Sequence, residues 1–177
     1  LQELEAFGAT LGPNTPYHVQ RQYLNTLAAL QVDAARMDAA GQTAEKLLAL
    51  AQNNKDDAGL VLAGTTSALL MSLAGKTDAA IVKLLDMEPV AVHSASSEVL
   101  WQFYSTLAFA QNTTTKYESA LTNAIKSIEH AKARTTYGRA SYLRSLDLLV
   151  NVYVSMHNWD KALSINEEAL IVADEVR

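Results

Sequence analysis

The sequence predicts an all-helical protein built from about four stacked, antiparallel helix pairs. Of its 177 residues, 49% are hydrophobic and 19% are charged, which is enough apolar material for one buried core. Only three prolines and seven glycines interrupt stretches rich in alanine and leucine, which are strong helix formers. Apolar side chains recur at helical spacing, and the pattern repeats about every 40 residues.

A short helix over about residues 1–10 leads the chain, and the first helix pair follows over about residues 17–54. Thr15 is placed to cap the first helix of this pair, with Pro16 at the first helical position. Proline has no backbone N–H, and an N–H at that position would make no hydrogen bond within the helix. Gly41 is expected near a helix boundary. The inward-facing positions are Leu24, Leu27, Ala28, Ala40, Ala44 and Leu47.

The second pair covers about residues 56–87, with Gly75 near its turn and Pro89 after its end. The stretch from Gly59 to Thr66 has the glycine spacing of a phosphate-binding loop. It lacks the lysine that reaches the phosphates, and no strand precedes it. We therefore interpret these small residues as a place where helices approach closely. The packing positions are Gly64 to Met71 on the first helix and Ala79, Ala80 and Leu84 on the second.

The third and fourth pairs cover about residues 94–133 and 138–177. Thr115 and Glu118 fit a capping box, and Gly138 lies at a helix boundary. In the third pair the inward-facing positions are Tyr104, Leu107, Ala108, Ala120, Ala124, Ser127 and Ile128. In the fourth they are Leu146, Leu149, Val150, Tyr153, Ala162, Ala169 and Leu170, with the turn at Met156 to Asn158 and Trp159 opening the last helix.

The last pair resembles the tetratricopeptide repeat (TPR), in which a bulky residue, a leucine, a small residue and a tyrosine pack against two alanines and an aromatic side chain. Asn166 stands where the aromatic is usual, and Gln111 replaces the tyrosine in the third pair. Spacings of 39, 41 and 42 residues separate Ala40, Ala79, Ala120 and Ala162, whereas the usual TPR period is about 34. The resemblance implies a right-handed superhelix with a concave groove.

Composition excludes several classes of partner. The formal net charge of −5 and the lack of a basic cluster argue against nucleic acid and against an anionic membrane surface. No apolar run reaches the roughly 20 residues that span a bilayer. There is no cysteine, and the four histidines are isolated in sequence, so we expect no disulfide, no metal and no cofactor. No nucleophile, base and orienting group stand together, so we expect a binding region and not an enzyme.

In TPR proteins ligands lie along the surface of the first helix of each pair, and repeat position transfers this surface to eight residues here. Trp101 is a ninth candidate, because it shares a helix face with Phe109. Arg144, Asp147 and Asn151 form a stripe at i, i+3 and i+7, with Arg144 suited to an acidic group. The alternative is a solvated helix face, with Asp147 as the partner of Arg144. The candidate binding residues are Gln22, Asn25, Trp101, Gln102, Ser105, Phe109, Arg144, Asp147 and Asn151. The expected partner is a protein, a peptide or a small polar ligand, and a homodimer is a further option.

The opening segment, a short helix followed by Gly12-Pro13 and then Thr15 to Arg21, resembles helical-repeat sensor regions that precede diguanylate cyclase (GGDEF) domains in membrane-bound bacterial proteins. This resemblance implies a periplasmic, non-catalytic sensor. Because the chain begins without methionine and stops inside a periodic stretch, we expect a single domain cut from a longer protein. The alternative function is an intracellular interaction scaffold, or the regulatory domain of a transcription activator with units of about 40 residues. The flanking gene sequence discriminates between them.

Overall fold

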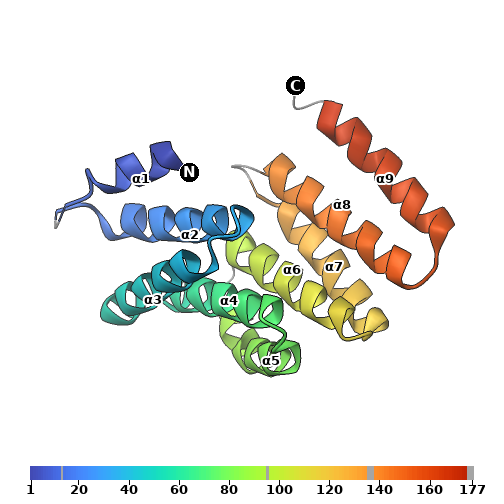
Figure 1. Cartoon of the computed structure of the whole chain (residues 1–177), viewed down its shortest axis with the longest axis horizontal. Helices are drawn as coiled ribbons and strands as arrows, with labels where there is room; N and C mark the ends of the chain where they lie inside the picture. Colours follow the sequence, from blue (N-terminus) through green and yellow to red (C-terminus); the bar gives the residue numbers. More distant parts are fainter. Residues whose placement is uncertain (13, 95, 135–137, 175–177) are drawn as a thin grey trace.

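A computed structural model describes residues 1–12, 14–94, 96–134 and 138–174. Within these residues the chain forms nine α-helices and no strand (Figure 1). The helices are α1 (Gln2–Gly8), α2 (Tyr17–Asp33), α3 (Met37–Asn54), α4 (Asp57–Leu73), α5 (Thr77–His93), α6 (Ser97–Thr113), α7 (Tyr117–Lys132), α8 (Gly138–Ser155) and α9 (Trp159–Asp174). The all-α class predicted from the sequence is therefore confirmed. The Pro13 of the opening segment and the final residues 175–177 lie outside the described residues.

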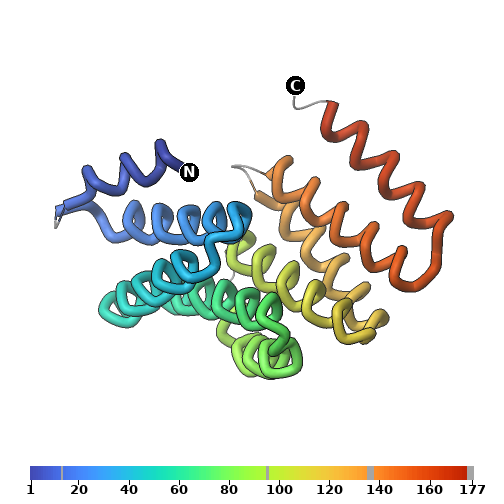
Figure 2. The backbone as a smooth tube through the Cα atoms, in the orientation of Figure 1, coloured from blue at the N-terminus to red at the C-terminus, as the bar shows by residue number. Residues whose placement is uncertain are grey.

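The helices pack in two layers. Each helix contacts the next along the chain, and α2, α4, α6 and α8 also contact one another in succession. In the part of the chain that the structure describes, α3, α5, α7 and α9 make no such contacts with one another. We call α2, α4, α6 and α8 the inner layer and the other four the outer layer, with α1 lying against α2. Figure 2 shows the succession bending, so that α1 and α2 face α8 across an opening beside α6.

The turn between the two helices of each pair has the same geometry four times. Ala35, Gly75, Thr115 and His157 each follow an inner helix by two residues and have φ of 56°, 79°, 59° and 56°. In every case the next N–H bonds back to a carbonyl five residues earlier, as in the Lys116 to Gln111 bond of 2.9 Å. This bond satisfies a carbonyl in the last turn of the helix and is typical of a helix that ends in a residue with left-handed backbone geometry. The turns recur at intervals of 40, 40 and 42 residues.

The small residues of the outer layer follow the same period. Ala40, Ala80 and Ala120 are fully buried, and Ala162 is 6% exposed. Ala79, the repeat position expected from the sequence, is exposed, so that register was wrong by one residue in the second pair. When Ala80 replaces Ala79 in the series, the intervals between the four alanines equal the intervals between the four turn residues. Both are set by the same helix-turn-helix geometry.

Several expected helix boundaries were wrong. Helix α5 continues through Pro89 to His93 instead of ending near residue 87. Pro89 lies on the exposed side of α5, as does Leu85, whose carbonyl the proline leaves without its helical partner. Solvent can bond that carbonyl, so the helix is not interrupted. Gly41 lies inside α3 and not at its boundary.

The two threonine caps were also wrong. Helix α2 has Pro16 as its N-cap, and the Thr15 hydroxyl instead accepts a 2.9 Å hydrogen bond from the Gly12 N–H. Helix α7 has Lys116 as its N-cap without a side-chain bond, because Thr115 occupies the left-handed turn position. Side-chain caps are found instead at Asp56, before α4, and at Ser96, before α6.

The core lies between the layers. One apolar cluster centres on Leu47, Leu84 and Phe103 of α3, α5 and α6, and a second joins α6, α7 and α8 around Leu149. The end of the Met87 side chain of α5 packs directly on Gly64 of α4, where a Cβ would lie 2.3 Å from the Met87 methyl group. The stretch from Gly59 to Thr66 is thus helix and not a phosphate loop. Among the described helices, none combines the length and apolar character that crossing a lipid bilayer requires.

Candidate functional site

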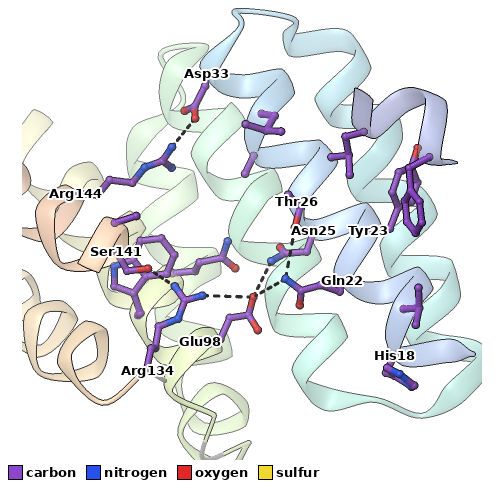
Figure 3. A pocket seen from close by; sticks show the side chains of 18 residues that line it. His18, Gln22, Tyr23, Asn25, Thr26, Asp33, Glu98, Arg134, Ser141 and Arg144 are labelled. Carbon is purple, nitrogen blue, oxygen red and sulfur yellow. Dashed lines mark hydrogen bonds and ion pairs between the residues drawn. The ribbon is translucent and has the colours of Figure 1, made fainter. Parts of the chain in front are cut away.

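A cavity of about 600 Å³ opens on the inner layer, and we call it the inner cavity. It is bounded by α1, α2, α6, the end of α7 and the start of α8, and its walls are mostly apolar (Figure 3). A second cavity of about 200 Å³, the adjoining cavity, lies between α2, α4, α6 and α8. The two share lining residues from α2, α6 and α8, so they form a continuous recess: the shared residues are Ala29, Asp33, Trp101, Gln102 and Arg144.

The structure brings together seven of the nine candidate binding residues. Gln22 and Asn25 line the inner cavity, and Ser105 and Phe109 line the adjoining cavity. Trp101, Gln102 and Arg144 line both. These residues come from α2, α6 and α8, so the recess is assembled from helices that are far apart in the sequence.

Asp147 and Asn151 line neither cavity, and both are exposed. They lie three and seven residues beyond Arg144 on α8, which is about 5 and 10 Å further along the helix axis. Only the first half of α8 borders the recess, so the stripe leaves it after Arg144. The partner of Arg144 is Asp33 and not Asp147.

One ion pair lies where the two cavities meet. The Arg144 Nη2 donates to Asp33 Oδ2 over 2.7 Å, and the two side chains are 56% and 48% exposed. A pair this exposed is screened by water and contributes little to stability. Its position matters more, because it joins the end of α2 to α8 across the recess.

A second charged group, deeper in the inner cavity, is held loosely. Glu98 Oε1 lies 4.0 Å from Arg134 Nη2 and accepts from the side-chain amides of Gln22 and Asn25 at 3.5 Å each (Figure 3). All three separations are at the outer limit for such contacts. The Glu98 carboxylate therefore has neighbours but no close partner.

Arg134 is nearly buried, with 11% of its side chain exposed. Its guanidinium lies 4.7 Å from the centre of the Trp101 ring and donates to the Ser141 hydroxyl. Burial lowers the pKa of Arg134, and the charge of Glu98 raises it. The guanidinium is thus a desolvated cation with only a distant carboxylate.

Trp101 is fixed as a wall of both cavities. Its indole N–H donates a 3.0 Å hydrogen bond to the Ser145 hydroxyl, which lies 3.1 Å from the Ser127 hydroxyl. Both serines are fully buried. This hydrogen bond explains why two serines lie inside a helix contact that is otherwise rich in alanine and leucine, because a buried indole N–H needs an acceptor.

Four buried polar atoms belong to residues that line the recess and have no hydrogen-bond partner among the described residues. Asn25 Oδ1 and Gln102 Oε1 belong to the inner cavity, and Thr65 Oγ1 and Ser105 Oγ to the adjoining cavity. Asn25 and Thr65 are each only 4% exposed. Buried polar atoms almost always have a hydrogen-bond partner, so a small turn of these side chains toward the recess would let a ligand or a water molecule supply one. Among the described residues, no group of histidine and carboxylate side chains is placed to hold a metal ion.

The sequence reasoning missed Asp33, Glu98, Arg134 and Ser141. Asp33 is the last residue of its helix, and Glu98 stands in the first turn of α6, where an acidic residue is ordinary. Arg134 follows the end of α7. Glu98 precedes Gln102 by four residues and Ser141 precedes Arg144 by three, so the helix-face pattern extended by one turn reaches both. Arg134 lies beyond the end of its helix, where that pattern gives no signal.

Comparison with known proteins adds information on the fold. No protein-family model matches the chain, and a search of curated proteins found no similar sequence. Among solved structures, the crystal structure of BtubC (BKLC) from P. vanneervenii is similar with a TM-score of 0.65 and 15% sequence identity. The match covers 96% of this chain and 69% of that chain. At this identity the similarity concerns the helical architecture alone.

Proposed function

We propose that this chain is a non-catalytic ligand-binding module of a bacterial signalling protein, with its ligand in the recess on the inner layer. One observation carries the proposal: four residues whose buried polar atoms have no partner among the described residues line the same recess that repeat position selects for binding. A recess that holds unpartnered polar atoms favours a ligand that supplies their partners.

The proposal includes a TPR-like, right-handed superhelix as the scaffold. Its support is the repeated left-handed turn, the buried alanines at the same intervals, and contacts that run through the inner layer but not the outer one. A stack in which only one layer is continuous curves toward that layer, and a concave inner surface is where such solenoids bind.

The size of the recess favours a small ligand over a folded protein. The inner cavity, of about 600 Å³, falls in the range of small-molecule pockets, and the adjoining cavity of about 200 Å³ extends it; both have mostly apolar walls and a few converging polar groups. A compact polar molecule or a short peptide segment fits these dimensions. A folded partner needs a larger continuous surface.

Signalling requires that binding change the geometry of the module. The recess is walled by α2 on one side and α8 on the other, and the exposed Asp33–Arg144 pair spans them. A ligand that contacts both walls stabilises one spacing of the two helices, which shifts the population toward that state. The periplasmic sensor region of a diguanylate cyclase is the setting that we propose from the resemblance of the opening segment. A secretion signal, a membrane helix and a cyclase domain in the flanking gene sequence would support it.

The binding site can be tested without knowing the ligand. A thermal-shift screen of pooled metabolites identifies ligands, and hydrogen exchange then locates them; protection should appear on α2, α6 and the first half of α8. Ala29→Phe should abolish binding, because Ala29 lines both cavities. Ala49→Phe on the exposed side of α3 is the matched control.

Two further variants separate the recess from the rest of α8. Asp147→Ala and Asn151→Ala should leave affinity unchanged, whereas Gln102→Ala should reduce it, because only Gln102 lines the recess. Protection confined to the outer layer, or an Ala29→Phe protein that binds normally, would contradict the proposal.

A further inference from the structure

Three side-chain oxygen atoms of residues that line the inner cavity lack a close hydrogen-bond partner among the described residues. Asn25 Oδ1 and Gln102 Oε1 are buried without a partner in that part of the chain. Glu98 Oε1 accepts only contacts of 3.5 to 4.0 Å. The residues belong to α2 and α6, and all three line the same cavity. A group of acceptors that includes a carboxylate suits a positively charged donor with several N–H bonds. A primary ammonium, with three donors, has that chemistry.

The cavity also contains a site for the opposite charge. Arg134 lies beside Glu98, and its guanidinium donates to Ser141 and contacts the Trp101 ring, which leaves N–H donors for a carboxylate. Burial lowers its pKa, so an additional anion nearby would be favourable. The separation of 4.0 Å between Arg134 and Glu98 shows that neither charge is tightly held by the other.

Charge balance decides between an ion of one sign and a zwitterion. Among the described aspartate, glutamate, lysine and arginine residues, those that line the inner cavity are two carboxylates, Asp33 and Glu98, and two guanidiniums, Arg134 and Arg144. A simple amine would place a second cation near Arg134, and a simple acid would place a second anion near Glu98. A ligand that carries both charges a few ångströms apart adds no net charge and supplies each side chain with a closer partner.

The remaining wall of the cavity is apolar. Leu4 and Phe7 of α1 and Val19 and Tyr23 of α2 line it. Phe7 and Tyr23 form an edge-to-face ring pair with centroids 6.0 Å apart. An apolar or aromatic side chain of the ligand would be buried against this wall, which is favourable by roughly 25 cal/mol for each Å² removed from water.

From these contacts we propose that the inner cavity binds a free α-amino acid with an apolar or aromatic side chain. Its ammonium would contact the Glu98 carboxylate, and its carboxylate would contact Arg134. A small turn of the Asn25 and Gln102 side chains would bring their amide oxygens to the ammonium as further acceptors. The inference rests on the proposed ligand-binding function and names the chemical class of the ligand. It is narrower than the peptide or polar ligand expected from the sequence, because the two charged partners are adjacent instead of being spaced along a groove.

The probe is L-phenylalanine, titrated by isothermal calorimetry into the full chain. L-leucine should also bind, because the proposed apolar wall does not require an aromatic ring. L-phenylalanine amide lacks the carboxylate, and N-acetyl-L-phenylalanine lacks the ammonium; each should bind at least tenfold more weakly. The dipeptide L-Phe-L-Ala should also bind at least tenfold more weakly, since its charges are about 3.5 Å further apart.

Substitutions test the two charged partners separately. Glu98→Gln keeps the shape of the side chain and removes its charge, so it should weaken the binding of L-phenylalanine at least tenfold. Arg134→Lys keeps the charge and removes the planar guanidinium. It should weaken the binding of L-phenylalanine but not that of L-phenylalanine amide, which has no carboxylate. Glu167→Gln, an exposed position on α9, is the control and should bind normally.

The fluorescence of Trp101 distinguishes failure of this inference from failure of the proposed function. The chain has two tryptophans, and the exposed Trp159 can be replaced by phenylalanine, which leaves Trp101 as the reporter in the cavity wall. L-phenylalanine should change the Trp101 emission at the concentrations at which heat is released. If neither amino acid binds at millimolar concentration, or if the amide or the dipeptide binds equally well, the inference is overturned. In that case a metabolite pool that still changes Trp101 emission preserves the proposed function, and a screen in which no pool does so contradicts both.

Discussion

Asp33 and Arg144 form an ion pair with an Nη2 to Oδ2 distance of 2.7 Å, although 111 residues separate them in the sequence. Asp33 is the last residue of α2, and Arg144 lies on α8, so the contact crosses the recess between the two ends of the inner layer. Both side chains are about half exposed.

The pair is expected to control helix spacing more than stability. Asp33→Asn and Arg144→Gln should each lower the free energy of unfolding by less than about 1 kcal/mol, with a coupling energy near 0.5 kcal/mol in a double-mutant cycle. Because the chain has no cysteine, spin labels can be attached to cysteines placed at the exposed positions 34 and 147. Asp33→Asn should broaden the distance distribution between them, and a coupling energy above about 2 kcal/mol would show a structural role instead.

Thr115 is a β-branched residue with a φ of 59°, a conformation that L-residues rarely adopt. Its equivalent in the second turn is Gly75, with a φ of 79° and open space within 4 Å of where a Cβ would lie. Thr115→Gly should therefore stabilise the protein by about 0.5 to 1 kcal/mol, and Gly75→Ala should destabilise it by about 1 kcal/mol. Chemical denaturation of both variants measures these differences. Effects of the opposite sign would mean that the four turns are not equivalent.

Ala120 and Ala162 occupy equivalent buried positions near the start of α7 and α9. Ala120 lies in the cluster that joins α6, α7 and α8 and has no exposed surface. Replacing either alanine by leucine should overpack the contact and cost about 1 to 3 kcal/mol, with the larger cost at Ala120. Glu167→Gln on the exposed side of α9 should change stability by less than about 0.5 kcal/mol. Thermal or urea unfolding compares the three, and equal stability would show that the two alanines are not at close helix contacts.

Asp56 joins two helix pairs and gives stability a dependence on acid pH. Its carboxylate caps α4, accepts from the Tyr17 hydroxyl and pairs with Arg21 at 3.0 Å. Burial tends to raise the pKa of Asp56, but the hydrogen bonds and charge of Tyr17 and Arg21 outweigh this and lower it. Asp56→Asn should cost about 1 to 2 kcal/mol at neutral pH. Asp57→Asn, at the exposed neighbouring position, is the control.

The direction of the pH effect at Asp56 follows from its lowered pKa. The unfolded chain binds this proton more readily than the folded protein, so the carboxylate contributes its stability above the ordinary pKa of 3.8. That contribution is lost as the pH falls below 3.8. Urea unfolding from about pH 7 to about pH 2 should therefore show the difference between the wild type and Asp56→Asn shrinking at the acid end, and a constant difference would contradict the assignment.

The helix class, the approximate extent of the helix pairs and the surface that faces the recess could be predicted from the sequence, because each depends on side chains a few residues apart. The spacing of alanine and leucine determines which side of a helix is buried, and repeat position then placed Asn25, Gln102 and Arg144 on the inner surface. The same reasoning was wrong where backbone geometry decided: Thr115 became a turn residue instead of a cap, and Pro89 was accommodated within α5.

Only the tertiary structure decided which side chains meet in the recess. Glu98 lies 73 residues from Asn25, and Arg144 lies 111 residues from Asp33, so their contacts depend on how several helix pairs bend around the inner layer. The same bend carries Asp147 and Asn151 past the edge of the recess, although they share a helix face with Arg144. Periodicity within one helix specifies a direction around its axis. The position along the axis at which a distant helix arrives is set by the packing of all the helices between them.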